Sequence, residues 1–415
     1  MINRPKGTKD VLPNEIAKYN YFEQTARKVF AKYNFKEIRT PVFEHTELFV
    51  RGVGESSDIV NKEMYTFKDK ADRSLTLKPE GTASIARAVI ENGLDNEAMP
   101  LKLFSYVPCF RYEKPQSGRL REHHQFSIEA YGSNEASLDV EVMGLVSEIF
   151  NQLNFTNYEL NINSIGCAKC RKTYIEKLKE YYTPFVNNLC EDCKRRFQQN
   201  PLRLLDCKES SCTAIKENAP KPKDYLCEDC KKHFDEVKLL LEASKIPYKI
   251  NPILVRGLDY YTKTVFEFMT TEEGALGTIC GGGRYDGLLE ELGGKPLSGV
   301  GVGLGEERIL ILLEKNKIDI PQEDALDLFV ATTDKQKLPF VMQLVNLLRN
   351  KNFKVDYDQC GRSLKSQMKF ADKIGAKNIV VIGDNEINTF TVQLKNMKTG
   401  AVKTDKINNI SKLIK

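Results

Sequence analysis

Residues 101–132, LKLFSYVPCFRYEKPQSGRLREHHQFSIEAYG, contain two apolar runs separated by a polar, charged loop. The first run, 101–111, is long enough for a buried strand, and the second, 121–132, alternates polar and apolar residues as a strand does. The loop between them, 112–120, contains Pro, Ser and Gly, which are common in strand connections. The stretch therefore predicts a long antiparallel pair, and with it an α+β fold built on an antiparallel sheet rather than a doubly wound one.

Helices and further strands surround this pair. Residues 14–34 carry apolar side chains at helical spacing and predict an amphipathic helix. The segment after it, 35–42, is expected to be extended, and Pro41 limits it to a sheet edge or a strand end. We also expect strands at 63–69, 74–82, 254–270 and 298–304, and helices at 83–91, 139–153 and 305–316.

The chain is long enough for two or three domains, since it has 415 residues. Composition changes at about 161–250, where Cys, Lys and Pro increase, and this segment is interpreted as an insertion into a first domain of 1–325. A linker at 318–325 precedes alternating strand and helix patterns, which predict a separate α/β domain of 326–415.

Composition excludes some classes of protein and leaves others open. The net charge of +5 permits an anionic partner without requiring one. No run approaches the roughly 18 apolar residues of a membrane span. The N-terminal stretch lacks the apolar region of a secretory signal, so we expect a cytoplasmic protein with no membrane partner.

Polar residues within or beside apolar strands are the candidates for chemistry. Burying such groups is costly unless each finds a partner or a charged ligand. A mixture of arginines and carboxylates suits a site for a polyanion and a zwitterion. Any one of these residues could instead lie on the solvent side of the sheet, but this does not explain all eight together. They are Glu80, Arg111, Arg119, Arg121, Gln125, Glu129, Arg256 and Arg308.

Residues 298–309, SGVGVGLGEERI, place alternating glycines in a predicted strand that leads directly into a helix. No βαβ unit precedes them, so they are weak evidence for a dinucleotide fold. Alternating glycines favour close approach of a flat ligand such as adenine, with Arg308 reaching toward a phosphate tail. Tight helix–sheet packing would explain the glycines but not the arginine.

Several of these stretches resemble the class II aminoacyl-tRNA synthetases. FRYEKPQSGRLREHHQF at 110–126 resembles motif 2, and GVGLGEERI at 301–309 resembles motif 3. The 14–34 helix with the strand ending at Pro41 is similar to motif 1, which builds the dimer interface of that class. LVRGLDYYTKTVFE and GGGRYDGLL resemble two signature segments of the histidyl-tRNA synthetase family, and the resemblance runs from about Pro5 to the end of the chain.

The resemblance implies a homodimeric histidine–tRNA ligase that uses ATP with Mg²⁺ and acts on tRNA(His). Arg111 would hold the ATP α-phosphate, with Glu113 near adenine and Arg308 on the γ-phosphate. Arg256 would face Arg111 across the α-phosphate, where other synthetases use a metal ion. Catalysis would then rest on positioning and fixed positive charge. The expected ATP-binding residues are Arg111, Glu113, Arg119, Arg121 and Arg308, and the expected catalytic residues are Arg111 and Arg256.

The resemblance also implies a pocket for the amino acid. Glu129 and Tyr261 would recognise the imidazole, so that apolar isosteres would leave buried polar groups unpaired. His123 and His124 could suggest acid–base or metal chemistry, but we expect a structural role because no cluster of His and carboxylate ligands is evident near them. The expected histidine-binding residues are Glu80, Gly81, Thr82, Gln125, Glu129, Tyr260, Tyr261 and Tyr285.

Eight of the eleven cysteines lie in the insertion, in closely spaced doublets. In a reducing compartment this clustering indicates metal or thiol chemistry rather than disulfides. Eight thiolates suffice for two tetrahedral zinc sites of structural role, although the thiols could also simply pack, and the spacing does not decide which doublets pair. They are Cys167, Cys170, Cys190, Cys193, Cys207, Cys212, Cys227 and Cys230.

The last domain resembles the anticodon-binding domain shared by several class II synthetases. Lys365, Lys369 and Lys373, with Arg362 before them, place three lysines on one helix face, which could follow tRNA phosphates or be only solvated. One departure from relatives is Lys114 in the motif 2 loop, where arginine is common.

Two other functions compete with this interpretation. One is a histidine-sensing regulatory subunit of ATP phosphoribosyltransferase, which typically lacks the last domain and degrades the LVRGLDYY segment; both are intact here. The other is a zinc-dependent nucleic-acid-binding protein, which would not explain the arginine and glutamate set.

Overall fold

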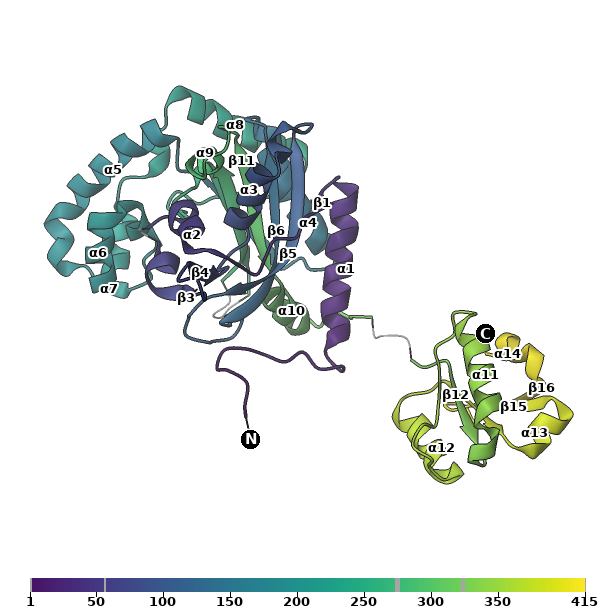
Figure 1. Ribbon diagram of the computed structural model, residues 1–415. Helices are drawn as coiled ribbons and strands as arrows, with labels where there is room; N and C mark the ends of the chain where they lie inside the picture. Colours follow the sequence, from purple (N-terminus) through teal and green to yellow (C-terminus); the bar gives the residue numbers. More distant parts are fainter. Residues whose placement is uncertain (1, 56, 273–276, 322–324, 415) are drawn as a thin grey trace. The chain divides into compact units, whose positions relative to one another are not determined.

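The computed structural model describes residues 2–55, 57–272, 277–321 and 325–414. It forms two compact units, Met1–Pro321 and Gln322–Lys415, both drawn in Figure 1. Within the predicted linker, residues 322–324 lie outside the described residues. Among the described helices, none has the length and apolar character needed to cross a membrane.

An eight-stranded sheet forms the centre of the larger unit, with the order β1-β5-β6-β11-β10-β9-β7-β8. The strands at the two edges, β1 and β8, run parallel to their neighbours, and the six between them are antiparallel. The predicted pair is β5–β6, in which Leu101 lies opposite Tyr131 and Phe110 opposite Glu122, so the antiparallel α+β fold is confirmed. The bounds are β1 Lys36–Glu37, β5 Leu101–Phe110, β6 Glu122–Tyr131, β7 Tyr158–Ser164, β8 Lys249–Ile250, β9 Thr262–Thr270, β10 Thr278–Tyr285 and β11 Gly299–Gly305.

Four helices cover one face of this sheet: α1 (Ile16–Lys32), α4 (Ala136–Gln152), α8 (Glu228–Ala243) and α10 (Glu306–Lys315) (Figure 1). The apolar stripe of α1 packs into a core with alternate residues of the strands, such as Phe126 and Ile128 of β6. Because successive strand residues point to opposite faces, the polar residues between them lie on the other face. The alternation of polar and apolar residues in the sequence therefore places the core on one face of the sheet and the candidate site on the other.

The opposite face is covered by shorter elements. These are α2 (Thr46–Val53), α3 (Thr82–Glu91), α9 (Leu288–Glu291) and a three-stranded sheet in the order β2-β4-β3. The bounds of its strands are β2 Phe43–His45, β3 Tyr65–Lys68 and β4 Ser74–Leu77. Two short helical turns, Ile59–Glu63 and Leu94–Asn96, connect these elements.

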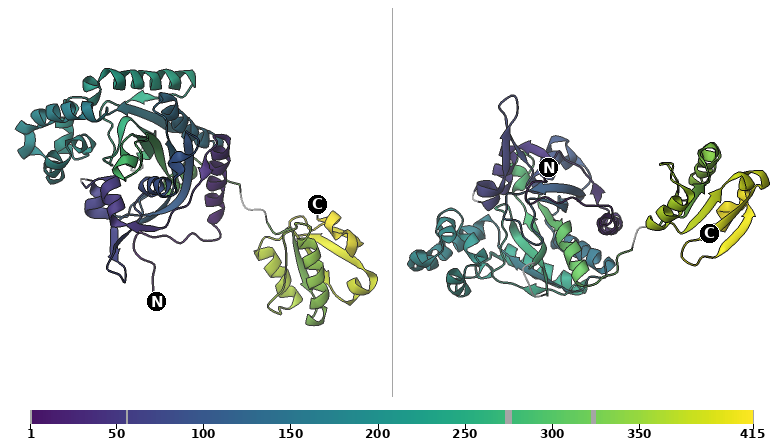
Figure 2. Two further views of the ribbon diagram at one scale, coloured as in Figure 1. Left: turned by 45° about the horizontal axis from the view of Figure 1, so that its top comes forward. Right: turned by 90° about the horizontal axis from the view of Figure 1, so that it is seen from below.

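The insertion is mainly helical, and its helices α5, α6 and α7 (168–217) lie on the side of the unit away from α1 (Figures 1 and 2). It begins later than the predicted residue 161, because β7, Tyr158–Ser164, pairs with β9 in the main sheet and buries Leu160 and Ile162 in its core. Its last helix, α8, packs on α4. The helices are α5 Ala168–Tyr182, α6 Glu191–Gln199, α7 Ser210–Glu217 and α8 Glu228–Ala243, with shorter ones at Thr183–Asn188, Pro201–Asp206 and Pro222–Tyr225.

The smaller unit has a five-stranded sheet in the order β13-β12-β14-β15-β16. The first three strands are parallel, as the alternating pattern predicts, and a hairpin that the sequence analysis did not identify adds β15 and β16. The bounds are β12 Leu328–Thr332, β13 Val355–Tyr357, β14 Asn378–Ile382, β15 Thr391–Asn396, β16 Val402–Lys406, α11 Leu338–Arg349, α12 Leu364–Lys373, α13 Asp384–Thr389 and α14 Ile410–Leu413, with short turns at Lys335–Lys337 and Ile407–Asn409.

Candidate active site

Strand β6 forms the floor of the candidate site. Gln125, Ser127 and Glu129 share the face opposite the helical core, and all three are buried. The Nε2 of Gln125 donates to Oγ of Ser127 at 3.0 Å. Across the next strand, β11, the partners of Glu129 and Ser127 are Gly301 and Gly303. A strand that is polar on one face and apolar on the other thus places hydrogen-bonding groups in a buried site.

The start of α3 supplies a second side of the site. Glu80 accepts hydrogen bonds from the backbone N–H groups of Thr82, at 2.7 Å, and Ala83, at 2.8 Å. The Thr82 hydroxyl donates to Glu129 at 2.7 Å. Gly81 allows this approach, because a Cβ atom there would lie 2.2 Å from Oγ of Ser127. The PEGT segment and β6 therefore meet as the sequence analysis expects.

Both carboxyl groups are perturbed by burial. Burial raises the pKa of Glu129 to about 8, although the hydroxyls of Tyr285 and Thr82 donate to it. Burial also raises the pKa of Glu80, against the two amide donors. Two buried carboxyl groups are costly to ionise unless a ligand pairs with them. The pocket therefore suits a ligand that carries a cation or hydrogen-bond donors.

Three buried tyrosines line this pocket. The ring centroids of Tyr260 and Tyr261 lie 4.5 Å apart, and those of Tyr260 and Tyr285 lie 5.4 Å apart. It is the Tyr285 hydroxyl that donates to Glu129. Tyr261 was expected to recognise the imidazole together with Glu129, and Tyr285 only to line the pocket; no local pattern indicates that Tyr285 is the donor to Glu129.

Arg256 lies in the loop before β9, beside these rings. Its guanidinium pairs with Glu267 and lies 5.9 Å from the centroid of the Tyr261 ring. Glu267 also accepts a hydrogen bond from the Thr278 hydroxyl at 3.1 Å. Gly281 gives the guanidinium room, since a Cβ atom there would lie 2.3 Å from its Nη1. Sequence reasoning missed Glu267, although a lone acidic residue within the apolar run TVFEFMT could have indicated it.

A group of arginines gathers at the β5–β6 loop and α10. The Nε of Arg111 donates to the carbonyl oxygen of Pro79 at 2.8 Å, and Arg308 donates to the carbonyl oxygens of Gly118 and Thr278. Burial, together with the charge of Arg119, lowers the pKa of Arg308. A neighbouring arginine that lowers the pKa of Arg308 indicates an excess of positive charge at this place, and such an excess favours a polyanionic ligand.

The remaining loop residues contact one another. Arg119 pairs with Glu113 at 3.4 Å. Arg121 donates to the carbonyl oxygen of Glu113 at 3.3 Å, and its guanidinium lies 3.9 Å from the centroid of the Tyr112 ring. The structure thus brings all the expected loop residues to one end of the β5–β6 pair.

The two adjacent histidines differ in surroundings. Burial, followed by the charge of Arg111, lowers the pKa of His123 to about 3, so it stays neutral. The Nδ1 of His124 lies 3.1 Å from Glu307, and this hydrogen bond raises the pKa of His124. The expectation that no carboxylates lie near was wrong, because Glu306 and Glu307 are both within 4.8 Å of the His124 ring nitrogen. The two glutamates follow β11 in the chain, and only the pairing of β6 with β11 brings them here.

The glycines of β11 serve a role different from the expected one at two positions. A Cβ atom at Gly301 would lie 1.9 Å from Glu129, and one at Gly299 would lie 2.3 Å from Tyr285. At these positions the missing side chain makes room for the protein's own groups rather than for a flat ligand. At Gly305 a Cβ atom would meet no described atom within 4 Å.

Comparisons with known proteins agree with this geometry. A family model described as histidyl-tRNA synthetase matches residues 7–309, and one described as an anticodon binding domain matches residues 327–415. The histidine–tRNA ligase of Clostridium novyi is 51% identical over 412 residues, covering 99% of this chain and 98% of that protein. The histidine–tRNA ligase of Caldanaerobacter subterraneus subsp. tengcongensis is 52% identical over 411 residues, covering 99% of both.

A solved structure gives the same result. The apo form of the S. aureus histidyl-tRNA synthetase superimposes with a TM-score of 0.85 at 40% identity and covers 100% of both chains. The family model alone matches well over half of the chain, and the relatives match it along nearly its whole length. The chain therefore belongs to the histidyl-tRNA synthetase family.

Proposed function

We propose that this chain is a histidine–tRNA ligase. It activates L-histidine with ATP to form histidyl-adenylate and pyrophosphate, and then transfers histidine to the 3′-terminal ribose of tRNA(His). The observation that supports the proposal best is that buried carboxyl groups and a group of arginines lie in the same site. Buried Glu80 and Glu129 lie on one side, and Arg111, Arg256 and Arg308 lie on the other.

The amino acid binds at the carboxyl groups. Glu80, Thr82 and Gln125 bind the ammonium group, and Gly81 keeps the turn close to the floor of the site. Glu129, positioned by the hydroxyls of Thr82 and Tyr285, accepts from the imidazole. Because a ring without nitrogen would leave this buried carboxyl unpaired, the pocket rejects apolar amino acids. Tyr260 and Tyr261 complete the lining.

ATP binds at the arginines. Arg111 holds the α-phosphate and Arg308 the γ-phosphate, while Glu113 lies toward adenine and Arg119 and Arg121 complete the loop. Mg²⁺ on the outer phosphates supplies further positive charge when bound. The Nε atom of Arg256 has no hydrogen-bond partner among the described residues, which supports a role for this side chain in binding a ligand.

The first step is an in-line displacement. A histidine carboxylate oxygen attacks the α-phosphorus, and the bond from that phosphorus to the pyrophosphate oxygen breaks. Both reactants are anionic, so Arg111 and Arg256 act by fixed positive charge on the two sides of the phosphorus. Glu267 and Gly281 keep the Arg256 guanidinium in place, so little reorganisation is needed.

The second step uses the tRNA. The terminal ribose hydroxyl attacks the adenylate carbonyl carbon, AMP leaves, and a phosphate oxygen of the adenylate takes the proton. The smaller unit binds the anticodon stem through exposed Lys365, Lys369 and Lys373 on α12. The proposal also includes a cytoplasmic homodimer built on α1, and structural zinc bound by the insertion cysteines.

ATP–pyrophosphate exchange with each of the twenty amino acids tests this proposal. We expect exchange with histidine alone. Exchange with another amino acid would overturn the pocket assignment, and no exchange from folded, dimeric protein would favour the regulatory subunit instead.

A matched pair of variants tests the assignment of Arg256. Arg256→Lys should lower the exchange rate by about 100-fold or more, because an ammonium cannot reproduce the fixed guanidinium. Arg73→Lys, at an exposed arginine paired with Asp69, is the control and should retain the wild-type rate. Equal rates for both variants would remove Arg256 from the mechanism.

A further inference from the structure

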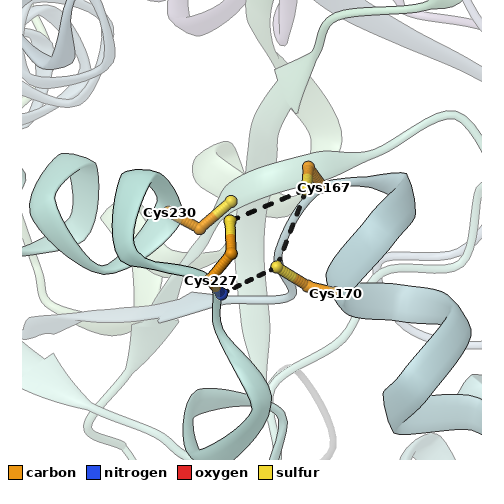
Figure 3. Close-up of side chains that lie close together, drawn as sticks. All are labelled: Cys167, Cys170, Cys227 and Cys230. Atoms are coloured by element: carbon orange, nitrogen blue, oxygen red, sulfur yellow. Dashed lines mark hydrogen bonds between the residues drawn. The ribbon is translucent and has the colours of Figure 1, made fainter.

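The eight cysteines of the insertion gather into two groups of four. In each group the sulfur atoms all lie within 4.8 Å of one another, and none of these cysteines forms a disulfide. Figure 3 shows the first group, whose side chains point toward one another from the starts of α5 and α8. The groups are Cys167, Cys170, Cys227 and Cys230, and Cys190, Cys193, Cys207 and Cys212.

The distances between sulfur atoms are those of a tetrahedral metal site. The Sγ atoms of Cys167 and Cys170 lie 3.6 Å apart, and those of Cys167 and Cys227 lie 4.0 Å apart. In the second group, Cys190 and Cys207 are 3.8 Å apart. Four thiolates at about 2.3 Å from a zinc ion are separated by about 3.8 Å. A disulfide would require about 2.05 Å, so these sulfur atoms surround a space of the size of one ion.

The local backbone also suits thiolate ligands. Cys167, Cys190 and Cys227 each directly precede a helix, so the second cysteine of each doublet lies in the first helical turn. The backbone N–H of Cys227 donates to the sulfur of Cys170 at 3.0 Å, and that of Cys190 donates to the sulfur of Cys212 at 3.4 Å. Amide donors of this kind stabilise the charge on metal-bound sulfur.

The helices between the cysteines bury few other side chains completely. The nine residues of α6 bury a single side chain, Cys193, and the eight residues of α7 bury a single side chain, Cys212. Isolated helices of this length are marginal in water. A bound metal ion would supply the missing stabilisation, because its binding free energy becomes folding free energy.

We propose that the insertion binds two zinc ions, one in each of these groups, and that the two sites hold the loop of residues 256–261 from two sides. The pairing of cysteines stands independently of the enzyme activity, whereas the importance of the loop rests on the proposed function. Four thiolates in tetrahedral arrangement favour zinc among the common divalent ions.

The first site holds the loop through Arg171, which follows Cys170 on α5. Its guanidinium donates to the backbone carbonyl oxygens of Asp259, at 3.2 Å, and Tyr261, at 2.5 Å. The N–H of Lys263 donates to the carbonyl oxygen of Gly166 at 2.9 Å. The backbone beside the tyrosine pocket is therefore anchored directly to the first zinc site.

The second site holds the loop through Asn200, which lies between Cys193 and Cys207 and whose Nδ2 donates to Oδ1 of Asp259 at 2.6 Å. Arg203, in the same segment, pairs with Asp58 at 3.1 Å. Arg195 and Arg196 of α6 also pair with Asp58, at 2.8 and 2.9 Å. A cavity of about 250 Å³ lies here, lined by Arg171, Arg203, Arg256 and Tyr261 among others.

Metal analysis of the full-length chain and double variants tests the pairing. We expect two zinc ions per wild-type chain and also per chain of Cys360→Ser, the control at an exposed cysteine outside both groups. Cys170→Ser with Cys230→Ser disrupts one site and should leave one ion, whereas Cys170→Ser with Cys193→Ser disrupts both and should leave none. If the first double variant loses both ions, the pairing is wrong. Wild-type protein that folds without zinc, or that holds iron instead, overturns the proposal.

Conservative variants that spare the ligands test the link to the loop. Arg171→Lys and Asn200→Ser should keep both zinc ions, yet lower kcat for histidine-dependent exchange by about tenfold or more with a smaller change in the KM for histidine. Full kcat with full zinc in both variants would overturn the role in holding the loop and leave the zinc sites standing. Wild-type chain that binds zinc but lacks exchange would instead contradict the proposed function.

Discussion

Gly301 on β11 lies opposite Glu129 on β6, and a Cβ atom at position 301 would come within 1.9 Å of the Glu129 carboxylate. The glycine therefore sets where the buried carboxyl can sit. Glu129 is also held by Thr82 and Tyr285, so it cannot move without breaking two hydrogen bonds. In the proposed function, recognition of the substrate ring thus depends on a residue that has no side chain of its own.

Gly301→Ala should weaken histidine binding by displacing Glu129. Loss of a hydrogen bond to a buried carboxyl costs about 1–3 kcal/mol, so kcat/KM for histidine should fall by about tenfold or more. Gly287→Ala is the matched control, because a Cβ atom there would meet Glu291 only at 3.7 Å. Exchange kinetics at varied histidine concentrations check this, and equal values for the two variants would contradict it.

Glu129 should make stability depend on pH in the ligand-free chain. Its pKa is raised to about 8 in the folded state, above the ordinary value of 4.5, so the folded state binds more protons than the unfolded state between these pH values. The free energy of unfolding should therefore decrease as pH rises through this range, by at most about 1.4 kcal/mol per pH unit for this group.

Glu129→Gln removes that contribution and isolates it from Glu306, whose pKa burial also raises to about 8. Thermal unfolding midpoints at pH 5.5 and pH 8 should differ less for the variant than for the wild type. A variant whose midpoint falls as steeply as that of the wild type would show that Glu129 is ionised throughout.

Arg284 is expected to be essential for stability rather than for chemistry. It is fully buried, pairs with Asp139 and donates to the carbonyl oxygens of Ser133, at 2.8 Å, and Glu135, at 3.0 Å. Arg284→Met should cost about 3–5 kcal/mol by removing the guanidinium that pairs with the buried Asp139 charge, which would keep only His233 at 3.5 Å. Urea unfolding measures this, with Arg73→Met as an exposed control. Adding Asp139→Asn should recover part of the loss, and no recovery would contradict the explanation.

The basic face of α12 should affect tRNA binding alone. Lys365, Lys369 and Lys373 are exposed, whereas Arg362 pairs with Asp358 at 2.7 Å and lies over the Phe370 ring. Changing the three lysines to glutamate should raise the KM for tRNA in aminoacylation by about tenfold or more, with the salt dependence reduced. Pyrophosphate exchange, which needs no tRNA, should be unchanged. Unchanged aminoacylation would show that this face is exposed to solvent without binding tRNA.

Much of the fold could be predicted because it depends on local patterns. The two apolar runs of 101–132 predicted β5 and β6, and the spacing of apolar residues in 14–34 predicted α1. The predicted start of the insertion at about 161 falls inside β7, although Leu160 and Ile162 alternate with polar residues there as in a strand. The hairpin of β15 and β16 was missed because it carries few apolar residues: β15 buries only Val392 and Leu394, and β16 is almost entirely exposed.

For the candidate site, the sequence supplied a set of expected residues but not the contacts between them. The resemblance supplied the members, including Glu80, Glu129 and Arg256. It did not supply Glu267 as the partner of Arg256, or Tyr285 as the donor to Glu129. Tyr285 and Glu129 lie on different strands, β10 and β6, whose register is decided by the sheet as a whole. Arg256 meets Glu267 only because the loop before β9 folds back on that strand.

The sequence by itself determined the elements, the polar faces of the strands and the identity of the chemical groups, because periodicity and residue type are local properties. Only the tertiary structure decided which cysteines share a site. Cys170 groups with Cys227, far along the chain, while Cys193 groups with nearby Cys207. Three of the doublets are C-x2-C and one is C-x4-C, and this spacing does not decide which doublets share a site. The packing of α5 and α8 brings the first and last doublets together, and the two doublets between them form the second group.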